Sequence, residues 1–115
     1  MASKPRSVDI KKKADNFGYS CQNLRVDREA GEEPSFEFKN KTKFNVEINF
    51  LDQNLVVDPA TGKVLPAVQL GPNRTSQPLL VNLELASGTY LYRVYLVEPD
   101  IEAEGGSRPG IEIVP

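Results

Sequence analysis

The chain of 115 residues contains no histidine and no tryptophan, and Cys21 is its single cysteine. Without an imidazole to act as general base, neither a Ser-His-Asp nor a Cys-His catalytic arrangement can form. One cysteine cannot form a disulfide within the chain, so cysteine usage does not identify the redox compartment. Cys21 lies in a segment of alternating apolar residues, which favours a buried, unreactive thiol. We therefore expect a protein that is not an enzyme and has no catalytic residues.

Long hydrophobic runs are also missing. No stretch approaches the ~20 apolar residues of a membrane-spanning helix. The basic residues near the start precede no apolar run of the roughly 7–15 residues that a signal peptide needs. We expect a cytoplasmic location, or an extracytoplasmic one if the Met-Ala-Ser start was added to a mature secreted chain. The formal net charge of -2 provides no basic field for nucleic acid or an anionic membrane, so neither is expected as a partner.

The length is that of one domain, and it suffices for a hydrophobic core without a disulfide or a metal. Residues 1–18 are charged and their few apolar residues show no periodicity, which predicts a mobile N-terminal arm. We interpret the lysine run at residues 11–13 as part of this solvated arm rather than as an anion-binding patch. Residues 19–115 form the predicted single β-sandwich domain.

Apolar residues alternate with polar ones along most of the remaining chain. Phe36 and Phe38 alternate with charged residues, and from Phe44 to Phe50 every second residue is apolar. This period of two is typical of antiparallel strands with one buried face. Turn-forming residues separate such segments at 30–34, 58–63 and 71–75. We predict an all-β sandwich of seven to eight short, mostly antiparallel strands, with an irregularity in the first strand near Gln22 and Asn23.

Three segments of the chain share a pattern with a known family. They are Phe36-Glu37-Phe38-Lys39-Asn40 with the following Phe44-Asn45-Val46-Glu47-Ile48, then Gly88-Thr89-Tyr90-Leu91-Tyr92-Arg93-Val94, and last Gly110-Ile111-Glu112-Ile113-Val114. In this order they resemble the cupredoxin family, and the second is similar to the Gly-Thr-Tyr-x-Tyr-x-Cys strand that leads into the copper loop. Immunoglobulin-like domains contain a similar turn and strand. The resemblance implies a two-sheet Greek-key sandwich of cupredoxin-like or immunoglobulin-like topology.

The copper ligands of that family are missing from the matching positions. A blue-copper site needs two imidazoles, a thiolate and a weak axial ligand. The resemblance places Phe44 and Val97 near the two histidine positions, Val94 at the cysteine and Arg108 at about the axial methionine. We therefore expect no copper, no other metal and no cofactor, so the resemblance implies the fold without electron transfer.

The predicted strand at residues 89–97 is largely apolar on both faces. One face carries Tyr90, Tyr92, Val94 and Leu96, and the other carries Leu91, Arg93, Tyr95 and Val97. The second set is too apolar for a plain solvent-exposed face, so either a loop such as residues 52–76 covers it or a partner does. Aromatic residues and arginine are enriched at binding hot spots. We expect a non-catalytic module that acts by protein–protein contact, with self-association as its simplest form, through this face and the adjoining Glu98, Asp100 and Glu102.

The alternative is a domain that binds a small ligand or a divalent cation with residues 98–106. Acidic residues alternate in this segment from Glu98 to Glu104, before Gly105-Gly106, and oxygen donors close together suit Ca²⁺. The segment lacks the Asp-x-Asp-x-Asp-Gly pattern that folds a loop round the ion. A solvated acidic loop is therefore the simpler interpretation of this charge run.

Overall fold

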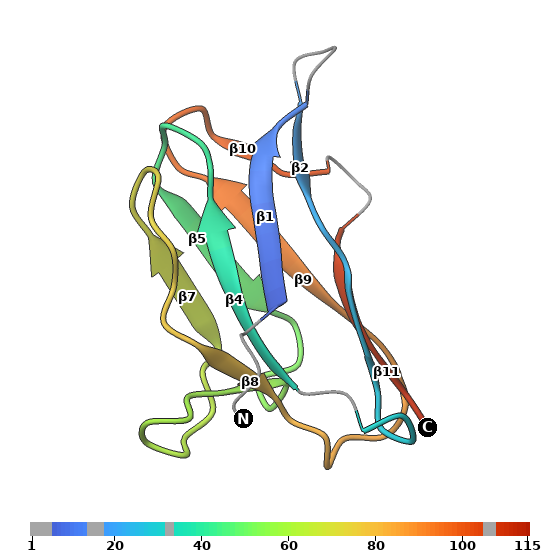
Figure 1. The fold of residues 1–115 in the computed structure, drawn as a ribbon. Helices are drawn as coiled ribbons and strands as arrows, with labels where there is room; N and C mark the ends of the chain where they lie inside the picture. The colour runs from blue at the N-terminus through green and yellow to red at the C-terminus, as the bar shows by residue number, and fades with distance from the viewer. Residues whose placement is uncertain (1–5, 14–17, 32–33, 105–107) are drawn as a thin grey trace.

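The structure is a computed structural model in which residues 6–13, 18–31, 34–104 and 108–115 are described. These residues form two β-sheets that pack face to face (Figure 1). The first sheet has the order β2 (Tyr19–Cys21), β1 (Arg6–Lys12), β4 (Ser35–Asn40), β8 (Leu79–Val81), β6 (Val56–Val57). The second has the order β3 (Leu24–Asp27), β11 (Gly110–Val114), β9 (Gly88–Leu96), β5 (Val46–Phe50), β7 (Ala67–Leu70), and β10 (Ile101–Glu102) pairs with the end of β9. The all-β sandwich prediction is confirmed. No helix in the described part of the chain is long and apolar enough to cross a bilayer.

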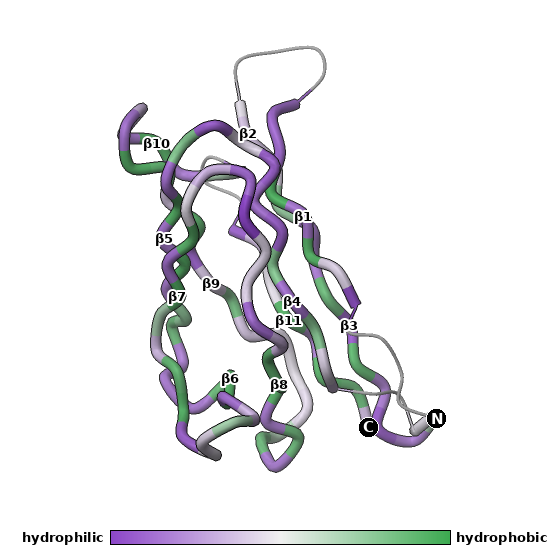
Figure 2. The backbone as a smooth tube through the Cα atoms, turned by 60° about the vertical axis from the view of Figure 1, so that its left-hand side comes forward, coloured by the Kyte–Doolittle hydropathy of each residue, from purple (hydrophilic) through white to green (hydrophobic). Residues whose placement is uncertain are grey.

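The hydrophobic core lies between the sheets and follows the period of two in the sequence. Hydrophobic and hydrophilic residues alternate along strands such as β4 and β5 (Figure 2). At the centre, the Phe38 ring centroid lies 6.1 Å from that of Phe50 and 5.7 Å from that of Tyr92. Burial of one large apolar side chain stabilises a fold by roughly 1.5–3 kcal/mol. Side chains contributed by both sheets therefore hold the two layers together.

Residues 6–12 form strand β1 inside the first sheet. β1 pairs in parallel with β4, from Arg6 opposite Phe36 to Ile10 opposite Asn40, and antiparallel with β2. Val8 and Ile10 are buried. The expected mobile arm is therefore wrong for residues 6–12, because these two apolar residues share one face and complete the core. Two alternating apolar residues among charges are too short a pattern to reveal this from sequence. Residues 1–5 and 14–17 of the expected arm lie outside the described residues.

The irregularity expected near Gln22 and Asn23 is where the chain passes from one sheet to the other. β2 ends at Cys21 in the first sheet, and β3 begins at Leu24 in the second, parallel to β11. The Gly110 backbone N–H donates to Asn23 Oδ1 at 2.8 Å, and the Tyr92 hydroxyl donates to the Gln22 carbonyl at 2.9 Å. These bonds satisfy backbone groups where the strand ladder is interrupted.

The described residues form eleven strands rather than seven or eight. β1 adds a strand, and the crossover divides one expected strand into β2 and β3. β10 falls in the expected acidic loop, and β7 falls in the stretch expected to be a covering loop. These short edge elements lack the long alternation by which a strand is recognised in a sequence.

Asn40, at the end of β4, fixes the loop that leads to β5. Its side chain is buried, and its Nδ2 donates to the Phe44 carbonyl at 2.8 Å and to the Gly71 carbonyl at 2.9 Å. Its Oδ1 accepts from the Thr42 backbone N–H at 3.0 Å and from Thr42 Oγ1 at 2.7 Å. All four hydrogen-bonding positions of the amide are used. A satisfied buried network of this kind makes residues 41–45 rigid.

Candidate functional site

The outer face of the second sheet carries the residues predicted to bind a partner. Leu91, Arg93 and Tyr95 alternate with buried residues of β9, and Val97 follows the strand. The Leu51 backbone N–H donates to the Leu91 carbonyl at 3.4 Å, which extends the β5–β9 pairing by one residue. Leu51 and Leu91 are therefore cross-strand neighbours on the outer face. We call Leu51, Leu91, Arg93, Tyr95 and Val97 the β9 surface.

Residues 52–76 do not cover the β9 surface. The exposed fraction is 53% for Leu51, 42% for Leu91 and 40% for Val97. Residues 52–76 instead bury Leu55 and Val56 in the core and contribute β7 to the sheet edge, next to β5. The expected covering loop is therefore wrong. Single exposed apolar residues are common on proteins, but Leu51 and Leu91 form an adjacent apolar pair that is open to solvent.

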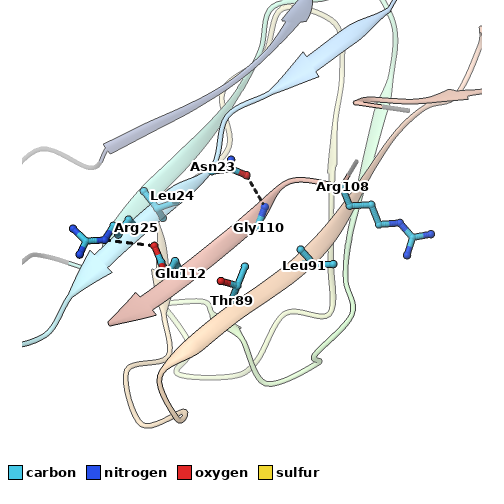
Figure 3. A pocket seen from close by; sticks show the side chains of 8 residues that line it. All are labelled: Asn23, Leu24, Arg25, Thr89, Leu91, Arg108, Gly110 and Glu112. Atoms are coloured by element: carbon cyan, nitrogen blue, oxygen red, sulfur yellow. Dashed lines mark hydrogen bonds and ion pairs between the residues drawn. The ribbon is translucent and has the colours of Figure 1, made fainter. Parts of the chain in front are cut away.

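A hollow of about 360 Å³ adjoins Leu91 on the side of β11 and β3 (Figure 3). It lies over Gly110, which pairs with Leu91 across the sheet. A Cβ atom at Gly110 would lie 2.9 Å from Thr89 Cγ2 and 3.3 Å from Leu91 Cδ2. The glycine therefore allows both side chains to approach the β11 backbone and leaves a depression beside them.

Charged pairs border the leucine pair and the hollow. Arg25 Nε lies 3.4 Å from Glu112 Oε1 on one side. On the other side, Arg108 Nε donates to Glu102 Oε1 at 2.9 Å, and Arg93 Nε lies 3.8 Å from Glu102 Oε2. Arg93 Nε is shielded from solvent and has no hydrogen bond among the described residues. Partly exposed pairs stabilise a fold by only about 0–1 kcal/mol, so they contribute mainly a rim of both charge signs.

Tyr95 connects the β9 surface to the acidic segment. Its hydroxyl donates to the Asp100 carboxylate, and this hydrogen bond raises the pKa of Tyr95. Glu102 lies opposite Tyr95 in the β9–β10 register. The structure thus brings the predicted interaction residues Tyr95, Asp100 and Glu102 together. Glu98 lies apart from them and accepts hydrogen bonds from the Asn45 backbone N–H at 3.0 Å and from Asn45 Nδ2 at 2.6 Å.

The acidic segment does not direct its carboxylates toward one point. Glu98 accepts from Asn45, and Asp100 accepts from Tyr95. Glu102 pairs with Arg93 and Arg108. Glu104 pairs with Lys13 and accepts from the Cys21 backbone N–H. Within the described ranges, no three acidic, cysteine or histidine side chains form a group that could hold a metal ion. Residues 105 and 106 of the expected loop lie outside those ranges. The geometry therefore does not favour the cation-binding alternative.

The four positions that the family resemblance assigns to copper ligands offer no suitable donor set. Phe44 packs edge-on against Tyr19 with 6.2 Å between ring centroids, and Val94 is buried in the core. Val97 is exposed, and Arg108 is bound to Glu102. Two valines and a phenylalanine have no donor atoms, and the guanidinium is a cation that does not ligate metals.

Cys21 is buried beside Tyr92, as the sequence predicted for the thiol. Its Sγ lies 3.3 Å from the Tyr92 hydroxyl. Burial raises the pKa of Cys21 to about 12, and burial also raises the pKa of Tyr92 well above its usual value. The thiol is therefore protonated at neutral pH, and a protonated thiol is a poor nucleophile.

Two residues of the site were missed by sequence reasoning. Leu51 directly follows Phe50, and two consecutive apolar residues at a strand end place one side chain on each face. Gly110 stands at the start of a strand whose other residues alternate between apolar and charged up to Ile113, and a glycine in a strand often marks a close approach of side chains to the backbone. Both signals were present, but neither identifies its neighbour across the sheet.

Comparison of the chain with protein-family models and with curated proteins finds no match to either. The functional argument therefore depends on the geometry of the surface described above.

Proposed function

We propose that this chain is a non-catalytic domain that acts by protein–protein contact through the β9 surface, with a second copy of the chain as the partner. The observation that carries the proposal is the exposed Leu51–Leu91 pair directly beside the hollow over Gly110. A two-fold contact uses the same patch on both copies. In such a contact the Leu51–Leu91 pair of one copy faces the hollow over Gly110 of the other copy. Each copy then fills the hollow of its partner.

The charged rim supports the same contact. An apolar centre surrounded by polar groups is the usual arrangement of a protein interface. The pairs Arg25–Glu112 and Arg108–Glu102 lie on opposite sides of the leucine pair. A two-fold contact brings arginines of one copy near glutamates of the other, which fixes orientation more than it adds affinity.

The expected affinity is modest. Each half-exposed leucine contributes about 1 kcal/mol on burial, and association costs at least about 4 kcal/mol in lost translational and rotational freedom. The four leucines of a two-fold contact contribute about 4 kcal/mol and therefore only offset this cost. The rim contacts and the filled hollows provide the net affinity, and we expect a weak dissociation constant on the order of 1 mM, or about -4 kcal/mol.

Sedimentation velocity between about 10 µM and 1 mM tests the proposal with the variants Leu91→Asp and Val64→Asp. Val64 is a matched control, because it is apolar and 43% exposed but lies beside Val57 of the other sheet. We expect the wild type and Val64→Asp to dimerise over this range, and Leu91→Asp to remain monomeric. A wild type that stays monomeric at the highest concentration, or equal dissociation by both variants, contradicts the proposal.

We also propose that the domain is cupredoxin-like in fold and has lost the copper site. The matched segments fall in strands β4, β5, β9 and β11, and the four ligand positions provide no donors for copper. Titration with Cu²⁺, followed by visible absorption, is expected to give no thiolate-to-copper charge-transfer band. A band that disappears in Cys21→Ala would contradict this part of the proposal.

A further inference from the structure

A second hollow, of about 410 Å³, lies at the end of the sandwich where β1 and β4 end and the loop to β5 begins. It is lined by Lys12, Lys41 and Lys43, by the rings of Tyr19 and Phe44, and by polar residues of the adjoining turns. Its size falls within the range of about 300–1,000 Å³ that is usual for small-ligand sites. It is separate from the β9 surface.

The parallel pairing of β1 with β4 brings two lysine-rich segments together at this hollow. Ile10 lies opposite Asn40, and the Lys41 backbone N–H donates to the Ile10 carbonyl at 2.8 Å. Beyond this pairing, Lys12 of the first segment and Lys41 and Lys43 of the second line the same hollow. The lysine run at residues 11–13 was expected to be part of a solvated arm. The structure instead anchors it next to a second set of cations.

The cations at the hollow are only partly neutralised. Among the residues that the structure describes, no acidic side chain lines the hollow. The Lys41 ammonium lies 3.0 Å from Asp9 Oδ2, and the Lys43 ammonium lies 5.6 Å from the centroid of the Phe44 ring. Lys12 has no hydrogen bond or ion pair to any other residue that the structure describes, apart from the backbone pairing of its strand. The hollow therefore has a positive local potential although the chain has a net charge of -2, and an anion reduces the repulsion between its lysines.

The aromatic pair gives this hollow an apolar wall. Tyr19 and Phe44 pack edge to face, and both are partly buried. Tyr19 lies opposite Lys12 in the β1–β2 register, so the lysine and the ring stand on the same face. Phe44 is held in place by the Asn40 side chain, which donates to its carbonyl. Charge and ring surface are thus adjacent and rigidly supported.

We infer that this hollow binds a phosphorylated small molecule that carries a flat ring, the chemistry of a nucleoside phosphate. Lysine ammonium groups bind phosphate oxygens as point charges. The ring of the ligand packs against Tyr19 and Phe44, as bases stack on aromatic side chains in proteins that bind single-stranded nucleic acid. The inference does not depend on self-association through the β9 surface.

Calorimetric titration with ADP, pyrophosphate and adenosine at about 50 mM salt tests the inference. The double variant Lys12→Gln/Lys43→Gln removes two charges of the hollow, and Phe44→Leu removes a ring. Lys63→Gln is the matched control, because Lys63 is exposed and lies in the turn after Asp58, away from the hollow. Thermal melting establishes that each variant is folded. The double lysine variant changes exposed side chains alone, so it tests the site even if Phe44→Leu is unstable.

We expect ADP to bind roughly 10-fold more tightly than pyrophosphate, since one order of magnitude corresponds to about 1.4 kcal/mol of ring contact. The double lysine variant weakens both anions about 10-fold or more, and Phe44→Leu weakens ADP alone. Lys63→Gln has no effect, and adenosine binds too weakly to measure. The inference is overturned if ADP binds no more tightly than pyrophosphate or if Lys63→Gln weakens binding as much as the double variant. Absence of any ADP binding up to about 5 mM overturns it as well.

Discussion

The lysine-rich hollow and the acidic segment are neighbours, and the Lys13 ammonium lies 3.4 Å from the Glu104 carboxylate between them. The two regions differ in whether their charged side chains have a hydrogen-bonded or ionic partner. Each carboxylate from Glu98 to Glu104 has a hydrogen-bonded or ionic partner elsewhere in the chain. At the hollow, by contrast, Lys43 faces a ring, and Lys12 has no ionic partner within the described residues. The difference arises from strand pairing. The ends of β1 and β4 lie side by side and bring Lys12 to the same hollow as Lys41 and Lys43, whereas β10 presents Glu102 to two arginines. A charge run read from a sequence does not reveal which of the two arrangements it will adopt.

The largest expected loss of stability comes from Asn40→Ala. This variant removes the side chain that holds residues 41–45, the loop that carries Lys41 and Lys43. Four hydrogen bonds are lost. The Gly71 carbonyl loses the donor that Asn40 provides, and the Phe44 carbonyl keeps only the longer bond from Thr42 Oγ1 at 3.3 Å. We expect a loss of about 3 kcal/mol in the free energy of unfolding, measured by urea denaturation. Asn45→Ala is the matched control, since Asn45 is exposed and its side chain bonds to Glu98. Equal losses in both variants would show that the Asn40 network does not hold the loop.

The second effect is a dependence of stability on pH that arises from Cys21, which lies between the two charged regions. Glu104 accepts a hydrogen bond from the Cys21 backbone N–H at 3.3 Å, above the buried Cys21–Tyr92 pair. Burial raises the pKa of Cys21 from 9.0 to about 12 in the folded chain. The resulting stability is fully present below pH 9 and is lost as the pH rises toward 12. At about pH 11 the loss amounts to between about 2 and 3 kcal/mol for the thiol.

Melting temperatures of the wild type and Cys21→Ala between pH 8 and 11 measure this effect. The wild type is expected to lose more stability over this interval than the variant, which keeps the contributions of Tyr92 and Tyr95 but lacks that of the thiol. Identical slopes for the two proteins, together with fast labelling of the folded thiol at neutral pH, would contradict the assignment of Cys21 as a buried thiol of raised pKa.

Gly110→Ala tests the β9 surface beside the acidic segment. The added Cβ meets Thr89 Cγ2 at 2.9 Å, so the Thr89 and Leu91 side chains must move. Such overpacking costs about 1–3 kcal/mol, and we expect a value near the middle of that range in a urea melt. Gly62→Asn is a suitable comparison, because Gly62 has φ of 74° with no neighbouring atom within 4 Å and asparagine tolerates that backbone conformation. A neutral Gly110→Ala would mean that the hollow can expand freely.

The smallest effects are changes in the free energy of unfolding that differ in sign between the two charged regions. Glu102→Gln removes the charge that faces Arg93 and Arg108, and we expect a loss of about 0.5 kcal/mol. Lys12→Gln removes one of several like charges and so reduces the repulsion between them. We expect no loss, or a gain of about a few tenths of a kcal/mol at low salt, where this repulsion is least screened. Thermal melts at low and high salt check both values. A loss in Lys12→Gln that matches the loss in Glu102→Gln would remove the contrast.

Much of the fold was predictable from local pattern, because alternation at Phe36–Phe38 and Phe44–Phe50 reports which side chains face a core. The face of residues 91–97 was also found from sequence. What remained hidden depends on pairing between distant segments. Val8 and Ile10 become core only because β4 lies beside them, and Leu51 joins the site only because Leu91 is its cross-strand neighbour. No local period contains that information.

The most direct test of the central claim, that the β9 surface is the contact between copies, is a dilution series followed by two-dimensional amide NMR. We predict that the amides whose shifts depend on concentration belong to Thr89, Leu91, Arg93, Gly110 and their neighbours on β5 and β11. Leu91→Asp should abolish these shifts. Concentration-dependent shifts confined to the lysine-rich hollow or to β7, or no shifts at all, would contradict the claim.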